Sequence, residues 1–280
     1  MNLNEKKSVY QRTSSSKGKN IDMQNSHSVP AVPRVSVCLA LYNGEKFIRE
    51  QIESILSELC QYDEVIICDD ASTDGSCSII QAINDSRITL IRNTSNIGYV
   101  KNFEKAISLA KGDIIFLSDQ DDIWVKGKVK KVLTAFQKDN DISLVYHNIK
   151  PINASGNDLQ INIPEYSEGK RNSVTFLVRQ LIKPQIYGCA CCLNRKKIDR
   201  LLPFPVLVYE HDHWIAVWAA INGQIYFLRD KLVKYRRHES NVSPQHHFPL
   251  TTILRRRFKL AMQIFTAIYR RMFGSQHGRL

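Results

Sequence analysis

The sequence lacks several features that would place it in common protein classes. It has no uncharged apolar stretch of the roughly 18–20 residues that span a bilayer, and its first residues contain no apolar segment typical of a secretory signal. The seven cysteines show no disulfide-framework spacing. Although Cys189 and Cys192 form a CxxC, no second pair stands at zinc-finger spacing, so we expect buried, reduced thiols. These absences predict a protein kept in a reducing compartment, the cytoplasm.

Two phosphate-binding motifs are also missing. No GxxxxGK occurs and no GxGxxG follows the first predicted strand, which argues against a P-loop NTPase and a dinucleotide-dependent dehydrogenase. Acidic residues are absent from 249–280, which carries seven basic side chains, whereas 34–248 is nearly balanced with 27 basic and 25 acidic residues. Because the net charge of +12 gathers at the ends and not over a folded face, we expect contact with an anionic surface and no nucleic-acid partner.

Apolar runs and amphipathic segments alternate through the middle of the chain. Buried strands are expected at 35–41, 64–68, 88–91, 114–117 and 143–146, separated by helices at 46–59, 76–83, 99–110 and 126–137. After a long loop or hairpin over 150–170, we expect a helix near 172–182, an apolar stretch at 186–193, a helix at 210–222, and short strands at 225–228 and 232–235. This alternation predicts an α/β fold whose mostly parallel, Rossmann-like sheet is flanked by helices.

Aspartates follow two of the predicted strands directly. Asp69 and Asp70 end the second strand, and Asp119, Asp121 and Asp122 follow the fourth. Ligands of open α/β sheets bind at the carboxyl ends of the strands, so these side chains should share one rim. Like charges so close repel, and Mg²⁺ is commonly held by one or two carboxylates together with substrate phosphates. The sequence therefore predicts a metal–diphosphate site.

Several ordered motifs resemble those of glycosyltransferase family 2, which has the GT-A fold. They lie at 35–43, 69–74, 96–98 and 117–124, and the similarity runs from about residue 34 to 243. The string Ser-Asp-Gln-Asp-Asp-Ile-Trp at 118–124, with the segments 211–216 and 235–242, is similar to the bacterial rhamnosyltransferase-like branch. Two positions depart from that branch: His213 stands where a second Trp is common, and Arg237 where a Gln is common.

The resemblance implies an inverting, metal-dependent transfer of a sugar from a nucleotide-diphosphate donor, with deoxythymidine-diphosphate-rhamnose as the leading candidate. It implies Asp212 as the general base, and Asp119, Asp121 and His238 as ligands of Mg²⁺ or Mn²⁺. The implied nucleotide-sugar contacts are Ala40, Tyr42, Asn43, Asp70, Asn96, Gly98, Lys101, Asp119 and Arg236. The acceptor would be a glycan or lipid-linked hydroxyl in cell-surface polysaccharide synthesis.

The chain is expected to have three parts. Residues 1–33 are polar and predicted to be a disordered tail. The GT-A domain covers 34–248, with a nucleotide-sugar-binding half at 34–148 and an acceptor-binding half at 149–248. Residues 249–280 should form a basic amphipathic helix with an apolar stripe of Leu250, Leu254, Phe258, Ala261, Phe265, Ile268 and Met272. Such a helix suits the cytoplasmic face of a membrane, or it docks on the domain.

Two other functions fit parts of the sequence. A nucleotidyltransferase on a related fold would want a Gly/Arg/Lys-rich phosphate loop after the first strand, and residues 42–45, Tyr-Asn-Gly-Glu, are not one. A non-catalytic, membrane-associated adaptor would use the basic ends and would not need the acidic rim. Release of nucleotide diphosphate from nucleotide sugars separates these functions from sugar transfer.

Overall fold

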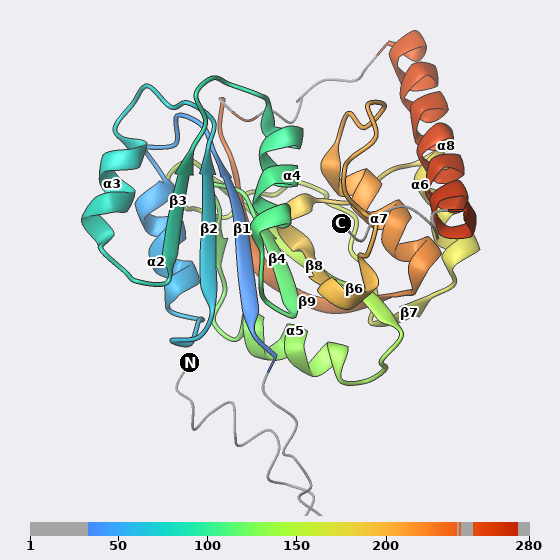
Figure 1. The fold of residues 1–280 in the computed structure, drawn as a ribbon, viewed down its shortest axis with the longest axis horizontal. Helices are drawn as coiled ribbons and strands as arrows, with labels where there is room; N and C mark the ends of the chain where they lie inside the picture. Colours follow the sequence, from blue (N-terminus) through green and yellow to red (C-terminus); the bar gives the residue numbers. More distant parts are fainter. Residues whose placement is uncertain (1–32, 240, 242–248, 274–280) are drawn as a thin grey trace, which may run out of the picture.

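A computed structural model of the protein describes residues 33–239, 241 and 249–273. Residues 1–32 of the tail expected at 1–33 lie outside the described residues, as do 274–280 of the expected C-terminal segment. The described chain forms an α/β fold around one mixed sheet with helices packed against it, as the sequence predicts (Figure 1).

The first half of the sheet is parallel, in the order β3-β2-β1-β4. Its elements are β1 (Val35–Leu41), α2 (Ile48–Leu56), β2 (Glu64–Asp69), α3 (Ser76–Ile83), β3 (Ile88–Arg92), α4 (Tyr99–Leu109) and β4 (Ile114–Ser118). β1, β2 and β4 are buried along nearly their whole length, which explains why their sequences are apolar runs without polar alternation. The carboxyl ends of these strands therefore meet at one edge of the sheet.

The second half continues the same sheet with antiparallel and parallel pairs, in the order β4-β8-β6-β9-β5, and β7 pairs with β9. Its strands are β5 (Ile123–Trp124), β6 (Ile142–Asn153), β7 (Gly169–Arg171), β8 (Cys191–Asn194) and β9 (Gln224–Arg237). Its helices are α5 (Lys128–Phe136), α6 (Ser173–Ile182), α7 (His211–Asn222) and α8 (Leu250–Phe273), with short 3₁₀ turns η2 (Gly188–Ala190) and η3 (Arg195–Lys197).

The two short strands expected at 225–228 and 232–235 are one continuous strand, β9, and the separation predicted between them is wrong. β9 pairs with β6 over most of its length, with shifts of register around Asn148. The side chain of Asn148 donates to the backbone oxygen of Arg229. The charged residues 229–231 therefore occupy an irregularity in the ladder where the sequence pattern had indicated a turn. Because β6 stays paired with β9 beyond this irregularity, β6 extends to Asn153, well beyond the expected 143–146.

The cysteines and the C-terminal helix fit this core differently. All seven thiols are free and all but Cys77 are buried, as expected.

α8 packs against α7 and α6 at the right of Figure 1, burying Leu260, Gln263 and Ala267. Among the described residues, no helix is both long enough and apolar enough to cross a membrane.

Candidate functional site

A cavity of about 790 Å³ opens at the carboxyl edge of the parallel strands. It is lined by residues from both halves of the chain, because α7 and the segment before it face the ends of β1, β2 and β4 across the opening. Eight residues singled out from the sequence line it: Ala40, Tyr42, Asp70, Asn96, Gly98, Asp119, Asp121 and Asp212. The other four, Asn43, Lys101, Arg236 and His238, are not among the lining residues.

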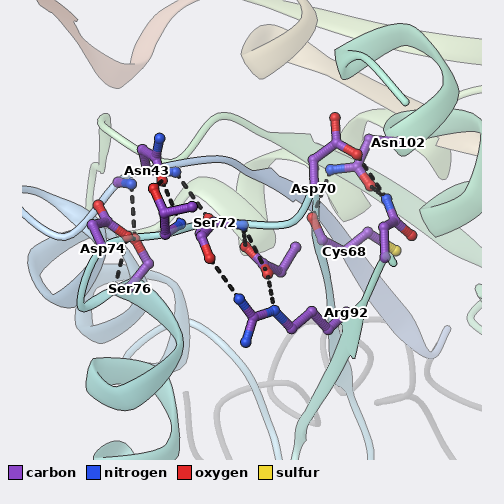
Figure 2. Close-up of polar contacts among 12 residues, drawn as sticks. Asn43, Cys68, Asp70, Ser72, Asp74, Ser76, Arg92 and Asn102 are labelled. Carbon is purple, nitrogen blue, oxygen red and sulfur yellow. Dashed lines mark hydrogen bonds and ion pairs between the residues drawn. The ribbon is translucent and has the colours of Figure 1, made fainter. Parts of the chain in front are cut away.

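Asp70 lines this cavity and organises one wall of it. Figure 2 shows Asp70 among its polar neighbours. Its Oδ1 accepts from the side chain of Asn93 and from the backbone N–H of Ile97, each at 2.8 Å. Its Oδ2 accepts from the backbone N–H of Gly98 at 2.9 Å. Gly98 caps α4 with a φ of 84°, a conformation that favours glycine. The carboxylate thus fixes the loop that enters α4, and its charge is favourable at the helix N-terminus.

Asn43 and Asp69 shape the neighbouring loop and do not line the cavity. The Oδ1 of Asn43 accepts from the backbone N–H of Thr73, which ties the end of β1 to the loop after β2. Asp69 forms an ion pair with Arg92 at 3.3 Å and accepts from the backbone of Ser72 (Figure 2). The expectation that Asp69 belongs to the acidic group at the rim is therefore wrong, since its charge is compensated by Arg92 of β3.

The aspartates after β4 form a compact acidic group. The Oδ2 of Asp121 lies 2.8 Å from Nε2 of His238. Oδ1 of Asp122 accepts from the backbone N–H of Arg236, while its buried Oδ2 has no hydrogen-bond partner in the described part of the chain. Burial and the charge of Asp121 raise the pKa of Asp119 to about 7, and the same two causes raise the pKa of Asp122 well above its usual value. The negative charges of this group are therefore only partly compensated.

These residues fit a hard divalent cation. Carboxylate oxygens are the ligands that Mg²⁺ prefers, and a cation would relieve the mutual repulsion of Asp119 and Asp121. The thiol of Cys189 lies close to Asp119 and Asp122, with possible ligand atoms of the three residues within 4.8 Å of one another. Burial raises its pKa well above the usual value, so it is a protonated thiol and a poor ligand for such a cation. The carboxylate oxygens, with the imidazole nitrogen of His238 beside Asp121, make up the usable set.

A second acidic group surrounds Asp212, at the start of α7. Glu210 forms ion pairs with His213 at 2.8 Å and with Arg256 of α8 at 3.3 Å. Because Glu210 is paired in this way, its own pKa is lowered despite burial. Burial, reinforced by the charge of Glu210, instead raises the pKa of Asp212 to about 6. Asp212 is the poorly compensated carboxylate of this group.

Arg236 and Lys101 do not occupy the positions expected of nucleotide contacts. The guanidinium of Arg236 is buried and donates to the backbone oxygens of Asp121 and Ala154 and to the carboxylate of Glu50. It therefore clamps the loop after β4 and does not point into the cavity. The ammonium of Lys101 lies on the surface, 2.6 Å from Glu104.

Lys128 was missed by sequence reasoning. Its side chain is fully buried, donates to the backbone oxygen of Cys189 at 3.1 Å, and lies 4.2 Å from the ring centroid of Trp124. Its positive charge counters the aspartates, since it lowers the pKa of Asp119. A lysine in the first turn of an amphipathic helix is normally exposed, so the pattern gave no signal for this residue.

The fold and the cavity define the class of the protein. A parallel sheet whose carboxyl edge carries a cavity lined by aspartates from the ends of β2 and β4 is the arrangement of a GT-A enzyme that uses nucleotide sugars. The chain belongs to glycosyl transferase family 2: the sequence profile of the family described as "Glycosyl transferase family 2" matches residues 36–202. The protein is thus a glycosyltransferase.

Individual relatives support this membership. An uncharacterized glycosyltransferase of Methanocaldococcus jannaschii is 29% identical over 73% of this chain and 71% of its own length. The UDP-Glc:alpha-D-GlcNAc-diphosphoundecaprenol beta-1,3-glucosyltransferase WfgD of Escherichia coli is 26% identical over 75% of this chain and 79% of its own. The crystal structure of S. aureus TarS 1–349 with UDP-GlcNAc superposes with a TM-score of 0.67 at 18% identity, covering 84% of this chain and 66% of TarS; this likeness concerns the fold.

Proposed function

We propose that this enzyme transfers a hexose or deoxyhexose, with inversion, from a nucleotide-diphosphate sugar to a hydroxyl of a glycan or lipid-linked acceptor in cell-surface polysaccharide synthesis. The observation that carries the proposal is that one cavity is lined by Asp70, by Asp119 and Asp121, and by Asp212. Donor and acceptor groups would therefore meet in one space. We assign donor binding to residues 34–148 and acceptor binding to 149–248.

On the donor side, Ala40, Tyr42, Asp70, Asn96 and Gly98 surround the space for the nucleoside. Asp119 and Asp121, with His238 beside Asp121, would hold Mg²⁺ or Mn²⁺. Such an ion would stabilise the charge that develops on the leaving diphosphate. Because the hydrogen bonds of Arg236 all go to protein groups, we assign it to positioning Asp121 in place of a contact with the diphosphate. Asn43 likewise acts through the loop that it ties.

On the acceptor side, Asp212 would take the proton from the attacking hydroxyl. A pKa of about 6 leaves it ionised at neutral pH and still basic enough to accept a proton. One base acting opposite the leaving diphosphate implies a single displacement, and therefore an inverted anomeric centre. Glu210 is the nearest other carboxylate, but it is engaged by His213 and Arg256.

Two nucleotide sugars are candidates for the donor. The names of the relatives reported above mention UDP-Glc and UDP-GlcNAc, which favours a UDP-hexose. The motifs at 118–124, 211–216 and 235–242 favour deoxythymidine-diphosphate-rhamnose. Incubation with a panel of nucleotide sugars and Mn²⁺, measuring nucleotide-diphosphate release, tests the proposal. Release from none of them, with and without lipid-linked acceptors, would contradict sugar transfer.

Replacing Asp70 with alanine is expected to weaken nucleotide binding at least about tenfold, because three hydrogen bonds to one buried carboxylate are lost and the loop at 93–98 is released. Titration calorimetry with UDP and Mn²⁺ measures the change. Asp74→Ala is the matched control, since Asp74 does not line the cavity and accepts hydrogen bonds from Ser76, the first residue of α3. Equal affinities in the two variants would remove Asp70 from the binding site.

α8 supports a peripheral contact with the cytoplasmic face of a membrane. Its apolar stripe, predicted from the sequence, faces outward: Leu254, Phe258 and Phe265 are 60%, 66% and 64% exposed. The helix docks on the domain through Leu260, Gln263 and Ala267 instead. Exposed aromatic and aliphatic side chains beside arginines suit an anionic bilayer surface.

Phe265→Glu is therefore expected to lower binding to phosphatidylglycerol vesicles severalfold without changing the melting temperature, because an exposed side chain contributes little to folding. Vesicle flotation measures the bound fraction. Val206→Glu serves as control, since it adds the same charge at a fully exposed position outside α8. If both variants float as the parent protein does, the stripe is not a membrane contact.

A further inference from the structure

α8 forms part of the cavity wall, although its sequence suggests an appendage. Ile253, Arg256 and Arg257 from its first turns line the cavity together with Lys183, which follows α6. Arg257 donates to the backbone oxygen of Ile182 at 2.9 Å, so α8 is fastened beside Lys183. The cavity therefore extends from the acidic group after β4 to a wall with three basic side chains.

The two ends of the cavity carry opposite charge. The end at the parallel strands holds Asp70, Asp119 and Asp121, which suit a metal-bound diphosphate. At the α8 end, Arg256 pairs with Glu210, and Arg257 and Lys183 add positive charge that this pair does not use. A guanidinium has five N–H donors in a planar fork that matches phosphate oxygens. This end suits a second anion that needs no metal.

The basic end borders the exposed apolar stripe of α8. Leu254 lies one turn before Arg257, and Phe258 follows it directly; both are largely exposed. A ligand with an anionic head and an apolar chain could place the head against Arg257 and Lys183 and the chain along Leu254 and Phe258. A soluble glycan would use neither feature, and a free anion only the first.

We propose that Arg257 and Lys183 form a subsite for the diphosphate of the acceptor, and that the acceptor is a sugar joined through this diphosphate to a long apolar chain. The sugar then extends into the cavity toward Asp212, and the chain follows the stripe of α8 into the bilayer. Arg256, through its ion pair, holds Glu210 in place between this subsite and Asp212. The inference rests on the proposed transfer reaction and adds the chemical class of the acceptor and the residues that bind it.

Binding of farnesyl diphosphate, a short diphosphate-linked apolar chain, tests the subsite in the full-length protein. EDTA is present, which removes the metal through which a diphosphate would bind at the acidic end of the cavity. Farnesyl diphosphate is expected to bind at least about tenfold more tightly than inorganic diphosphate or farnesol. Of the three, it alone can contact both the basic side chains and the apolar stripe of α8. Arg257→Glu and Lys183→Glu should each weaken binding at least about tenfold.

Arg255→Glu is the matched control, since Arg255 is an exposed residue of the same helix turn that does not line the cavity; its affinity should stay within about twofold of the parent protein. Unchanged binding in both Arg257→Glu and Lys183→Glu, or equal affinity for inorganic diphosphate, would overturn the subsite. If calorimetry with UDP and Mn²⁺ and the donor panel still succeed, only this inference fails. If they fail as well, the proposed function fails with it.

Discussion

Replacing Asp212 with asparagine is expected to lower turnover by roughly 10²–10⁴-fold, the contribution typical of a positioned general base. The amide keeps the size of the side chain and its acceptor oxygen for the backbone N–H of His213, which Asp212 now binds at 2.8 Å. It cannot take the proton of the acceptor hydroxyl. Nucleotide affinity should remain nearly unchanged, because the hydrogen bonds that Asp70 accepts from Asn93, Ile97 and Gly98 do not involve Asp212.

The pH dependence gives a second readout for the same residue. Burial raises the pKa of Asp212 to about 6, and only its ionised form can act as a base. The rate of the parent enzyme should therefore rise with pH through about 6 and level off above it. Asp212→Asn should lose this acidic limb. Single-turnover rates between pH 5 and 8, with calorimetric nucleotide affinities as control, measure both effects, and a fully active Asp212→Asn variant would exclude this role.

The Glu210→Gln variant tests whether Glu210 or Asp212 is the general base. Since Glu210 is held by His213 and Arg256 and its pKa is lowered, it is a weak base. Its replacement should cost less than that of Asp212 and should leave the acidic limb of the rate profile in place. A larger loss in Glu210→Gln than in Asp212→Asn would exchange their roles.

The acidic cavity could be predicted in outline because it follows from the periodicity of the strands. Apolar runs fixed β1, β2 and β4, and residues after parallel strands must gather at one edge. What the pattern could not decide was which member of each aspartate pair faces the cavity. Asp69 is the last residue of β2 and stands opposite Arg92 of β3, whereas Asp70, one residue later, lines the cavity. Neighbouring side chains of an extended chain point to opposite sides.

The basic wall was beyond sequence reasoning for a different reason. The stripe of α8 indicates an amphipathic helix, and burial of the apolar face is the usual outcome. The structure instead buries Leu260, Gln263 and Ala267, where α8 packs against α7 and α6, and hydropathy alone does not predict this face. Which arginines reach the cavity follows from this docking, so Arg256 and Arg257 could not be told apart from Arg255 beforehand.

Removal of divalent metal is expected to abolish transfer. Without a cation, Asp119 and Asp121 repel each other, and burial together with the charge of Asp121 raises the pKa of Asp119 to about 7. The leaving diphosphate would then meet carboxylates with no intervening positive charge, since Arg236 is committed to Glu50 and to backbone oxygens. Dialysis against EDTA should reduce nucleotide-diphosphate release to background, and Mn²⁺ or Mg²⁺ should restore it.

Variants of single aspartates test the metal site more specifically than metal removal does. In the parent protein Mn²⁺ with UDP should raise the melting temperature, because a ligand of the native state stabilises it. Asp121→Asn should lose most of this rise and several orders of magnitude in turnover, since it removes one of the two charges facing the cation. Asp74→Asn, which alters a carboxylate that accepts from the backbone N–H of Ser76 at the start of α3, should retain both. Full activity of metal-free enzyme would mean that Lys128 and the other internal cations already balance the acidic group, and that its carboxylates serve the sugar directly.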